Sequence, residues 1–173
     1  MKYPIGIQTF SQIREDGYVY VDKTDLIHQL VSRGKIYFFS RPRRFGKSLM
    51  LSTLEAYYEG RKELFEGLAI AGLEKDWLQY PVFHIDFNGD NFAKEGVLED
   101  KIEGFIAQGE RRYGKDPDLL TMGDRFEAVL KHASEKTGRR AVVLVDEYDK
   151  PMLQTFDNPD LQEDFRKTLT AFY

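Results

Sequence analysis

Apolar residues recur three or four positions apart in five stretches of the chain, which predicts amphipathic helices there. These stretches are residues 26–31, 47–58, 98–113, 126–133 and 159–172. Three shorter runs rich in β-branched and aromatic residues predict strands. The runs cover residues 35–40, 80–87 and 141–145. Because the predicted strands alternate with helices, the pattern indicates a layered α/β fold.

The run from Ala141 to Val145 gives the clearest strand, because it is apolar without alternation. Such a run is typical of a strand that is buried on both faces of a parallel sheet. In a parallel α/β sheet, ligands bind at the carboxyl ends of the strands. Ser40, Asp86 and Asp146 stand at the ends of the three predicted strands, so we expect a site at that edge.

The chain has 173 residues, of which 42% are hydrophobic and 31% are charged, as in a single globular domain. Its net charge of −4 argues against a protein that mainly coats nucleic acid, although a local basic patch is compatible with it. The absence of cysteine excludes disulfides and thiolate metal sites. No apolar run suits a secretory signal or a membrane span, so we expect a cytoplasmic protein without membrane contact.

Residues 38–55 read FFSRPRRFGKSLMLSTLE, a predicted strand that leads through a loop into a helix. The segment matches the phosphate-binding pattern GxxxxGK[ST], the Walker A motif, except that Arg41 stands at the first glycine. Gly46 supplies glycine where the backbone must approach phosphate closely. Lys47 would then reach the β- and γ-phosphates, and the Ser48 hydroxyl would bind Mg²⁺. The alternative is a basic, solvated turn at a helix start.

The phosphate-contacting segment of this loop is expected to be continuous. It consists of Arg43, Arg44, Phe45, Gly46, Lys47, Ser48 and Leu49. Guanidinium groups of Arg43 and Arg44 would stabilise charge beside the γ-phosphate. The alternative for each arginine is an ion pair with a nearby acid, such as Asp149, or plain solvation. Upstream, residues 22–24 either reach the nucleotide base or start a helix, and we favour the helix start.

A second motif, AVVLVDEYD, ends the strand at 141–145 with Asp146 and Glu147. P-loop ATPases keep an aspartate for Mg²⁺ at this place, the Walker B motif, and many add a glutamate that orients the attacking water. The alternative is a charged strand end that meets solvent. A glutamate after the aspartate favours hydrolysis of ATP over transfer of phosphate to a small molecule. The sequence assigns no chemical role to Arg41, Asp86 or Asp149.

Four blocks of the chain resemble bacterial AAA-ATPase-like proteins. They are GIQTFSQIREDGYVYVDKT, FFSRPRRFGKSLMLSTLEAYYEG, HIDFNG and VVLVDEYDKPML. The blocks stand in the expected order across nearly the whole chain, and RPRRFGKS is the typical loop of that family. The resemblance therefore implies a true phosphate loop in which Arg41 is a family feature.

The resemblance also implies a fold and a domain organisation. We expect a three-layer P-loop NTPase of the AAA-like (ASCE) branch, with a mostly parallel sheet that is incomplete on its C-terminal side. In this branch a strand that comes later in sequence separates the phosphate-loop strand from the Asp146 strand. Residues 1–173 would be the N-terminal portion of the ATPase domain, without the PD-(D/E)XK nuclease-like domain that commonly follows.

Three functions compete at this stage. The first is a Mg²⁺-dependent ATPase, with Lys47 and Glu147 as catalytic residues and Ser48 and Asp146 as metal ligands. This module would drive or gate the nuclease-like domain and contact nucleic acid only indirectly, and the sequence leaves both a monomer and a homo-oligomer open. The second is a nucleotide-gated regulatory module with little turnover. The third is an interaction domain with a degenerate site. The ATPase hypothesis is compatible with weak hydrolysis by this part of the protein alone.

Overall fold

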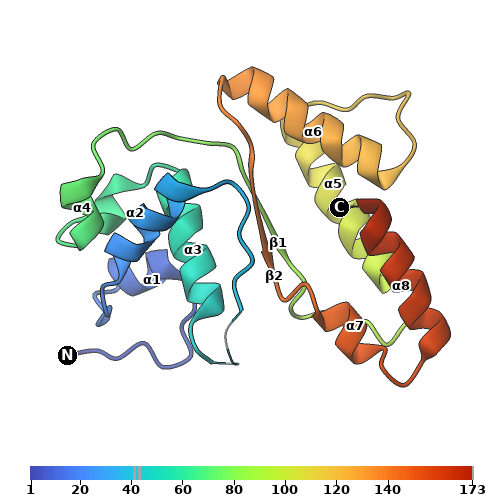
Figure 1. Ribbon diagram of the computed structural model, residues 1–173, viewed down its shortest axis with the longest axis horizontal. Helices are drawn as coiled ribbons and strands as arrows, with labels where there is room; N and C mark the ends of the chain where they lie inside the picture. The colour runs from blue at the N-terminus through green and yellow to red at the C-terminus, as the bar shows by residue number, and fades with distance from the viewer. Residues whose placement is uncertain (41, 43, 173) are drawn as a thin grey trace. The chain divides into compact units, whose positions relative to one another are not determined.

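The computed structural model describes residues 1–40, 42 and 44–172. Two compact units make up the chain, Met1–Val82 and Phe83–Tyr173, which are called the N-terminal unit and the C-terminal unit below. Among the described residues, the N-terminal unit consists of helices joined by irregular segments, with an isolated parallel bridge between Lys2 and Tyr18, whereas the C-terminal unit combines helices with a small sheet (Figure 1).

Helices of the N-terminal unit surround a small aromatic core. They are α1 (Phe10–Glu15), α2 (Thr24–Arg33), α3 (Lys47–Tyr58), the short 3-10 helix η1 (Lys62–Phe65) and α4 (Ala69–Leu73). Phe10 and Phe65 are fully buried, and their ring centroids lie 4.8 Å apart. The amide of Phe10 donates to Ser52 Oγ at 2.9 Å, so the start of α1 is bound to α3. The Trp77 ring packs against Phe65 and Tyr57, with centroids 5.0 and 5.9 Å apart.

Asp22 and Thr24 hold the starts of α2 and α4 together. Asp22 Oδ1 accepts hydrogen bonds from the amide and hydroxyl of Thr24, at 2.9 and 2.7 Å. Asp22 Oδ2 accepts from the amide of Ala69 at 2.7 Å, and the buried Thr24 hydroxyl accepts from the amide of Ile70 at 3.1 Å. The pair thus satisfies unpaired N–H groups at two helix N-termini. The expected helix start at residues 22–24 is confirmed.

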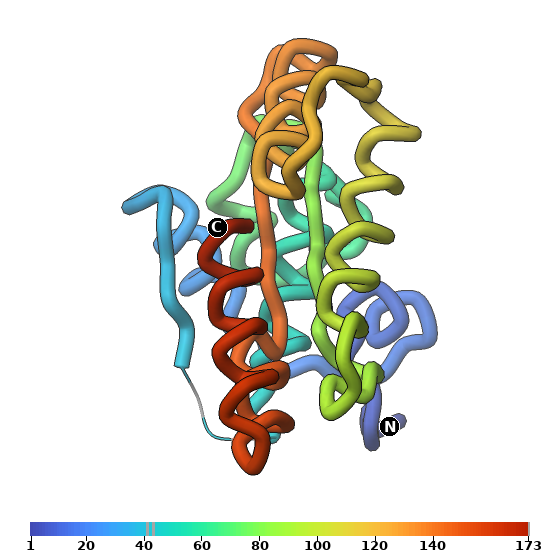
Figure 2. Tube along the Cα trace, turned by 90° about the vertical axis from the view of Figure 1, so that its right-hand side faces the viewer, coloured from blue at the N-terminus to red at the C-terminus, as the bar shows by residue number. Residues whose placement is uncertain are grey.

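The C-terminal unit is a two-stranded parallel sheet with helices against one face. Its elements are β1 (Val82–Asp86), α5 (Val97–Tyr113), α6 (Met122–Thr137), β2 (Val142–Asp146), α7 (Lys150–Gln154) and α8 (Pro159–Phe172). The strands are adjacent although α5 and α6 separate them in sequence (Figure 2). Buried side chains from β1, α5, α6 and α8 form one core. Gly109 on α5 permits close helix packing, since a Cβ there would lie 2.6 Å from Val129 Cγ1.

An ion network joins α5 to α6. The Arg125 guanidinium makes two hydrogen bonds to the Glu110 carboxylate, at 2.9 and 3.0 Å, and two to the Glu103 carboxylate, at 2.9 and 2.7 Å. The side chains of Arg125 and Glu110 are 13% and 8% exposed, so this fork is shielded from water. The hydrogen bonds from Arg125 hold the pKa of Glu110 below its ordinary value, although burial opposes them.

All five helices and two of the three strands predicted from the sequence are confirmed. Asn158 caps α8, because its Oδ1 accepts from the amide of Leu161 at 3.2 Å. The strand predicted at residues 35–40 is wrong, since that segment has no regular secondary structure, and Ile36 and Phe38 are 94% and 74% exposed. Val143 on β2 is 37% exposed, so β2 is not buried on both faces throughout.

The layered α/β prediction is therefore confirmed in its coarse form, as a mixed α/β chain with a parallel sheet of two strands. Across residues 1–40, 42 and 44–172, no helix is both long and apolar enough to cross a membrane.

Candidate functional site

The N-terminus of α3 has the geometry of an anion-binding site. Gly46 precedes the helix with φ of 75° and ψ of 29°, in the left-handed region that glycine adopts at little cost. No side chain caps this end in the part of the chain that the structure describes. The first α-helical hydrogen bond runs from the Met50 amide to the Gly46 carbonyl at 3.0 Å.

Consequently, the amides of Lys47, Ser48 and Leu49 have no hydrogen-bond partner among the described residues. Free amides and the positive end of the helix dipole together favour a phosphate group. A Cβ placed on Gly46 would meet nothing within 4 Å, so the outer side of this turn is open. The sequence adds four cations between residues 41 and 47, which attract an anion to the same turn.

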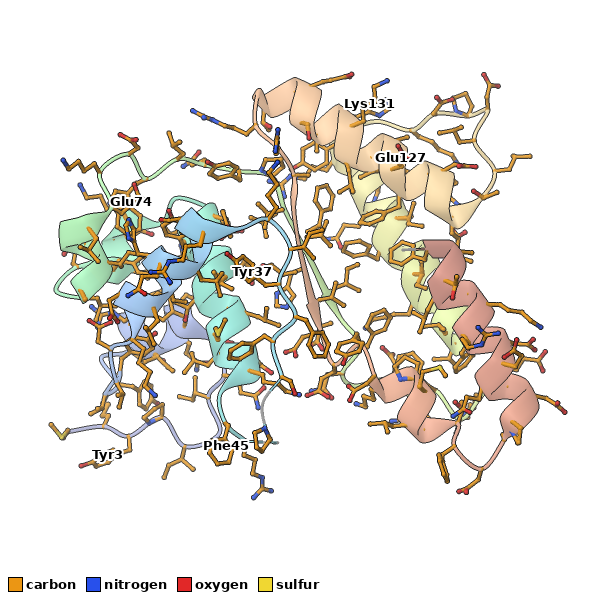
Figure 3. The ribbon with its side chains drawn as sticks, viewed as in Figure 1. Tyr3, Tyr37, Phe45, Glu74, Glu127 and Lys131 are labelled. Atoms are coloured by element: carbon orange, nitrogen blue, oxygen red, sulfur yellow. The ribbon has the colours of Figure 1, made fainter. Side chains whose placement is uncertain are left out.

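The turn that precedes Gly46 is also unusual. Arg44 has φ of 67°, although it is not glycine, and the amide of Phe45 donates to the Pro42 carbonyl at 3.3 Å. The Phe45 side chain is 64% exposed, beside the start of α3 (Figure 3). Arg41 and Arg43 lie outside the described residues, so the predicted phosphate contact of Arg43 stays a prediction.

An apolar cavity of about 480 Å³ opens beside this turn, entirely within the N-terminal unit. Phe45, Gly46, Leu49 and Met50 line one side of it. The rest of the lining comes from the N-terminal segment, α1, residues 19–23, α2 and Phe39. Its volume lies within the range of small-molecule sites, about 300–1,000 Å³. The cavity therefore has the size and position to hold an apolar ring attached to a phosphate chain.

The cavity wall includes large apolar side chains that are exposed to solvent. Tyr3, Val21 and Leu26 are 65%, 73% and 53% exposed, and all three line the cavity. Exposed apolar surface around a concave site commonly marks a ligand-binding surface. Lys23 is a charged residue of the lining; for residues 22–24 the sequence offered contact with the nucleotide base as the less favoured alternative to a helix start. The apolar run YVYV, which ends two positions before Lys23, also contributes to the lining and was assigned no ligand from the sequence.

The two predicted acids lie in the C-terminal unit, at the carboxyl end of β2. Asp146 is the last residue of the strand and is 6% exposed. Its Oδ1 accepts a hydrogen bond from the Glu147 amide at 2.9 Å, and its carbonyl accepts from the Phe87 amide at 3.2 Å. Glu147 has φ of 53°, an unfavourable conformation for a residue with a side chain.

Asp86 ends β1 beside the end of β2. Its Oδ1 accepts from the amide of Asn88 at 2.7 Å, which forms a tight turn after the strand. Asp149 precedes α7 without capping it through its side chain. Within the described residues, no three carboxylates or histidines lie close enough together to hold a metal ion by themselves.

Each unit thus contains one of the two motifs found in the sequence. Lys47 and Ser48 lie at the start of α3 in the N-terminal unit, whereas Asp146 and Glu147 lie after β2 in the C-terminal unit. The phosphate loop with its cavity and the acidic strand end together are typical of P-loop ATPases. A family profile described as a predicted AAA-ATPase matches residues 4–173. The chain belongs to the AAA-ATPase-like family.

Membership of the AAA-ATPase-like family implies nucleotide binding and suggests ATP hydrolysis. This AAA-ATPase-like chain is 42% identical over 174 residues to an uncharacterized protein in the vnfD 5′ region of Azotobacter chroococcum mcd 1. The match covers 99% of the chain but 34% of the relative, so the chain spans about a third of that relative's length. No solved structure matches the AAA-ATPase-like chain.

Proposed function

We propose that the chain binds MgATP and hydrolyses it as the nucleotide-binding part of a longer protein. The observation that carries the proposal is the start of α3, where Gly46 is left-handed. There, three successive amides beside an apolar cavity lack partners among the described residues. Such a helix end binds phosphate, and the cavity has room for the adenine ring. Family membership supports ATP as the ligand.

The proposed roles follow the chemistry of each side chain. The Lys47 ammonium and the amides of residues 47–49 would hold the β- and γ-phosphates, with Arg43, Arg44, Phe45 and Leu49 around them. Ser48 and Asp146 would supply oxygen ligands, which are the ligands that Mg²⁺ prefers. The bound ion would neutralise charge on the phosphate oxygens. Glu147 would orient the attacking water, as glutamates at this place do in related reactions.

The same proposal covers the rest of the fold. Residues 35–40 would join a larger parallel sheet that later residues complete, giving the three-layer P-loop fold. The exposure of Ile36, at 94%, supports this, because exposed apolar surface commonly marks an interaction site. The relative that extends well beyond the matched region supports further domains, and we propose that one of them is a nuclease-like domain gated by the nucleotide.

Thermal unfolding tests whether nucleotide binds. A ligand at 100 times its dissociation constant stabilises the folded state by about 2.7 kcal/mol. For a domain of this size, MgATP should therefore raise the melting temperature by roughly 5–10 °C. Lys47→Ala should abolish most of the shift. Lys62→Ala, which removes an exposed lysine from the start of η1 in the same unit, should keep it.

Phosphate release, measured alongside, separates hydrolysis from gating. Turnover that depends on Mg²⁺ and disappears in Lys47→Ala supports the ATPase. A full melting shift without turnover in the longer protein would instead support the nucleotide-gated module. Absence of any shift in the unaltered chain would overturn both and leave a degenerate site.

A further inference from the structure

The turn after β2 is held in a strained conformation by bonds on both sides of Glu147. On one side, the Glu147 amide donates to the Asp146 carboxylate at 2.9 Å. On the other side, the Glu147 carbonyl accepts from the amide of Lys150 at 2.9 Å. With φ of 53°, Glu147 keeps this conformation only as long as its neighbours impose it.

Lys150 connects this turn to the loop that follows β1. Its Nζ donates to Asn88 Oδ1 at 2.7 Å, a charge-assisted bond of the stronger class. Asn88 is itself fixed, because its amide donates to Asp86 and its Oδ1 also accepts from the Gly89 amide at 3.0 Å. Lys150 therefore bonds through its backbone to Glu147 and through its side chain to a rigid turn.

A second contact holds the other end of the same short helix. Gln154, the last residue of α7, accepts at Oε1 a hydrogen bond from the Phe92 amide at 2.8 Å. Phe92 is fully buried in the core of the C-terminal unit. Both ends of α7 are thus bound to the segment between β1 and α5. A shift of that segment would be transmitted to the residues directly after β2.

We propose that Lys150, through Asn88, is a positioning residue that holds Glu147 in the orientation required for ATP hydrolysis. The inference rests on the proposed function, because Glu147 matters for chemistry only if it orients water. The inference adds a requirement beyond the presence of Asp146 and Glu147. The loop after β1 must also be in place for turnover. Nucleotide affinity should not depend on this bond, since neither Lys150 nor Asn88 belongs to the phosphate loop.

The test compares variants that remove or keep the bond. Lys150→Met and Asn88→Leu remove it, whereas Lys150→Arg and Asn88→Asp keep a donor and an acceptor. In the first pair, kcat should fall about 10- to 100-fold while the KM for ATP stays within about twofold. The double variant Lys150→Met with Asn88→Leu should be no slower than the slower single variant. Lys150→Arg and Asn88→Asp should keep most of the kcat of the unaltered chain.

Lys131→Met is the matched control. Lys131 is an exposed lysine on α6 of the same unit (Figure 3), and its removal should leave kcat unchanged. A fall in kcat with Lys131→Met equal to that with Lys150→Met would overturn the inference. Multiplying effects in the double variant, or a rise in KM equal to the fall in kcat, would overturn it as well.

Hydrogen exchange gives a readout that does not need activity. Without nucleotide, the Glu147 and Lys150 amides of Lys150→Met should exchange about 10- to 100-fold faster than in the unaltered chain, while the α5 amides keep their protection. Unchanged exchange at those two amides overturns the inference even if kcat falls. An unaltered protein without turnover overturns the proposed hydrolysis instead, and the exchange result still decides whether Lys150 holds the turn.

Discussion

Three described residues other than glycine have a positive φ, and two of them belong to the proposed site. Arg44 in the phosphate loop has 67° and Glu147 after β2 has 53°, while Trp77 has 44° in the loop after α4. Each such residue costs on the order of 1–3 kcal/mol and persists where the surrounding structure imposes it, often at functional sites. The coincidence supports a functional role for both turns independently of the motifs.

Gly46→Ala tests the phosphate turn. Because a Cβ at Gly46 would meet nothing within 4 Å while φ is 75°, the cost is conformational, and the free energy of unfolding should fall by about 1–2 kcal/mol. Gly72→Ala in α4 is the control, since its Cβ also finds open space but φ is not positive. That change should raise the free energy by about 0.5–1 kcal/mol. Urea unfolding measures both, and a stabilised Gly46→Ala would contradict the assigned geometry.

Glu147→Gln tests the proposed base. The amide keeps the size of the side chain but cannot act as the carboxylate does, so turnover should fall by about 10²–10⁴-fold. Nucleotide affinity should remain, because the phosphate contacts come from the start of α3. Phosphate release and a melting shift measured on the same sample distinguish the two effects. Equal turnover in the variant would remove Glu147 from the mechanism.

At the scale of elements, the spacing of apolar residues predicted the helices well, because a helix forms its backbone hydrogen bonds within one segment of the chain. The helices near 26–31, 47–58, 98–113 and 159–172 were predicted from apolar spacing and are present as α2, α3, α5 and α8. Residues 35–40 have the composition of a strand, but a strand also needs a neighbouring strand, and this segment has no regular secondary structure. Apolar composition alone therefore did not determine their structure.

Contacts between distant residues were the part that sequence reasoning could not supply. The Arg125 fork to Glu103 and Glu110 spans 22 and 15 positions, and no periodicity reveals which charges meet. The cavity was missed for the same reason, because its walls come from six separate segments. By contrast, Gly46, Lys47, Asp146 and Glu147 were found because each motif is continuous and stands on its own element.

Arg125→Ala tests the link between α5 and α6. It leaves the Glu110 carboxylate, which is 8% exposed, without its partner, so the free energy of unfolding should fall by about 1–3 kcal/mol at pH 7. Arg166→Ala is the control on α8, since its pair with Glu163 is largely exposed and should contribute little. Equal losses in the two variants would show that the Arg125 network is not shielded from water.

The same network predicts a dependence on pH. Since the pKa of Glu110 is lowered in the folded chain, its contribution is complete above the ordinary pKa of glutamate, about 4.3, and is lost as pH falls through the lower folded value. Glu110→Gln should therefore reduce the loss of stability below about pH 4. Urea midpoints measured between neutral and acid pH provide the test. An unaltered slope in Glu110→Gln would contradict the assignment.

For the whole molecule, the proposed function assigns roles to residues of both units. Hydrogen exchange on the Glu147→Gln variant can follow each unit separately while ATP stays intact. With ATP and a chelator, protection should appear at the cavity and the start of α3. Adding Mg²⁺ should extend protection of up to about 100-fold to amides 146–150. Protection confined to the N-terminal unit despite Mg²⁺ would exclude Asp146 as a metal ligand.

Trp77 has a practical consequence for all such measurements. It is the one tryptophan of the chain, and its indole packs at a tilt against Phe65 and Tyr57 in the N-terminal unit. Tryptophan fluorescence, excited at the red edge of the absorption band, will thus report on the N-terminal unit, which carries the phosphate loop. Circular dichroism averages over both halves, so a mismatch between the two optical signals would reveal which half melts first.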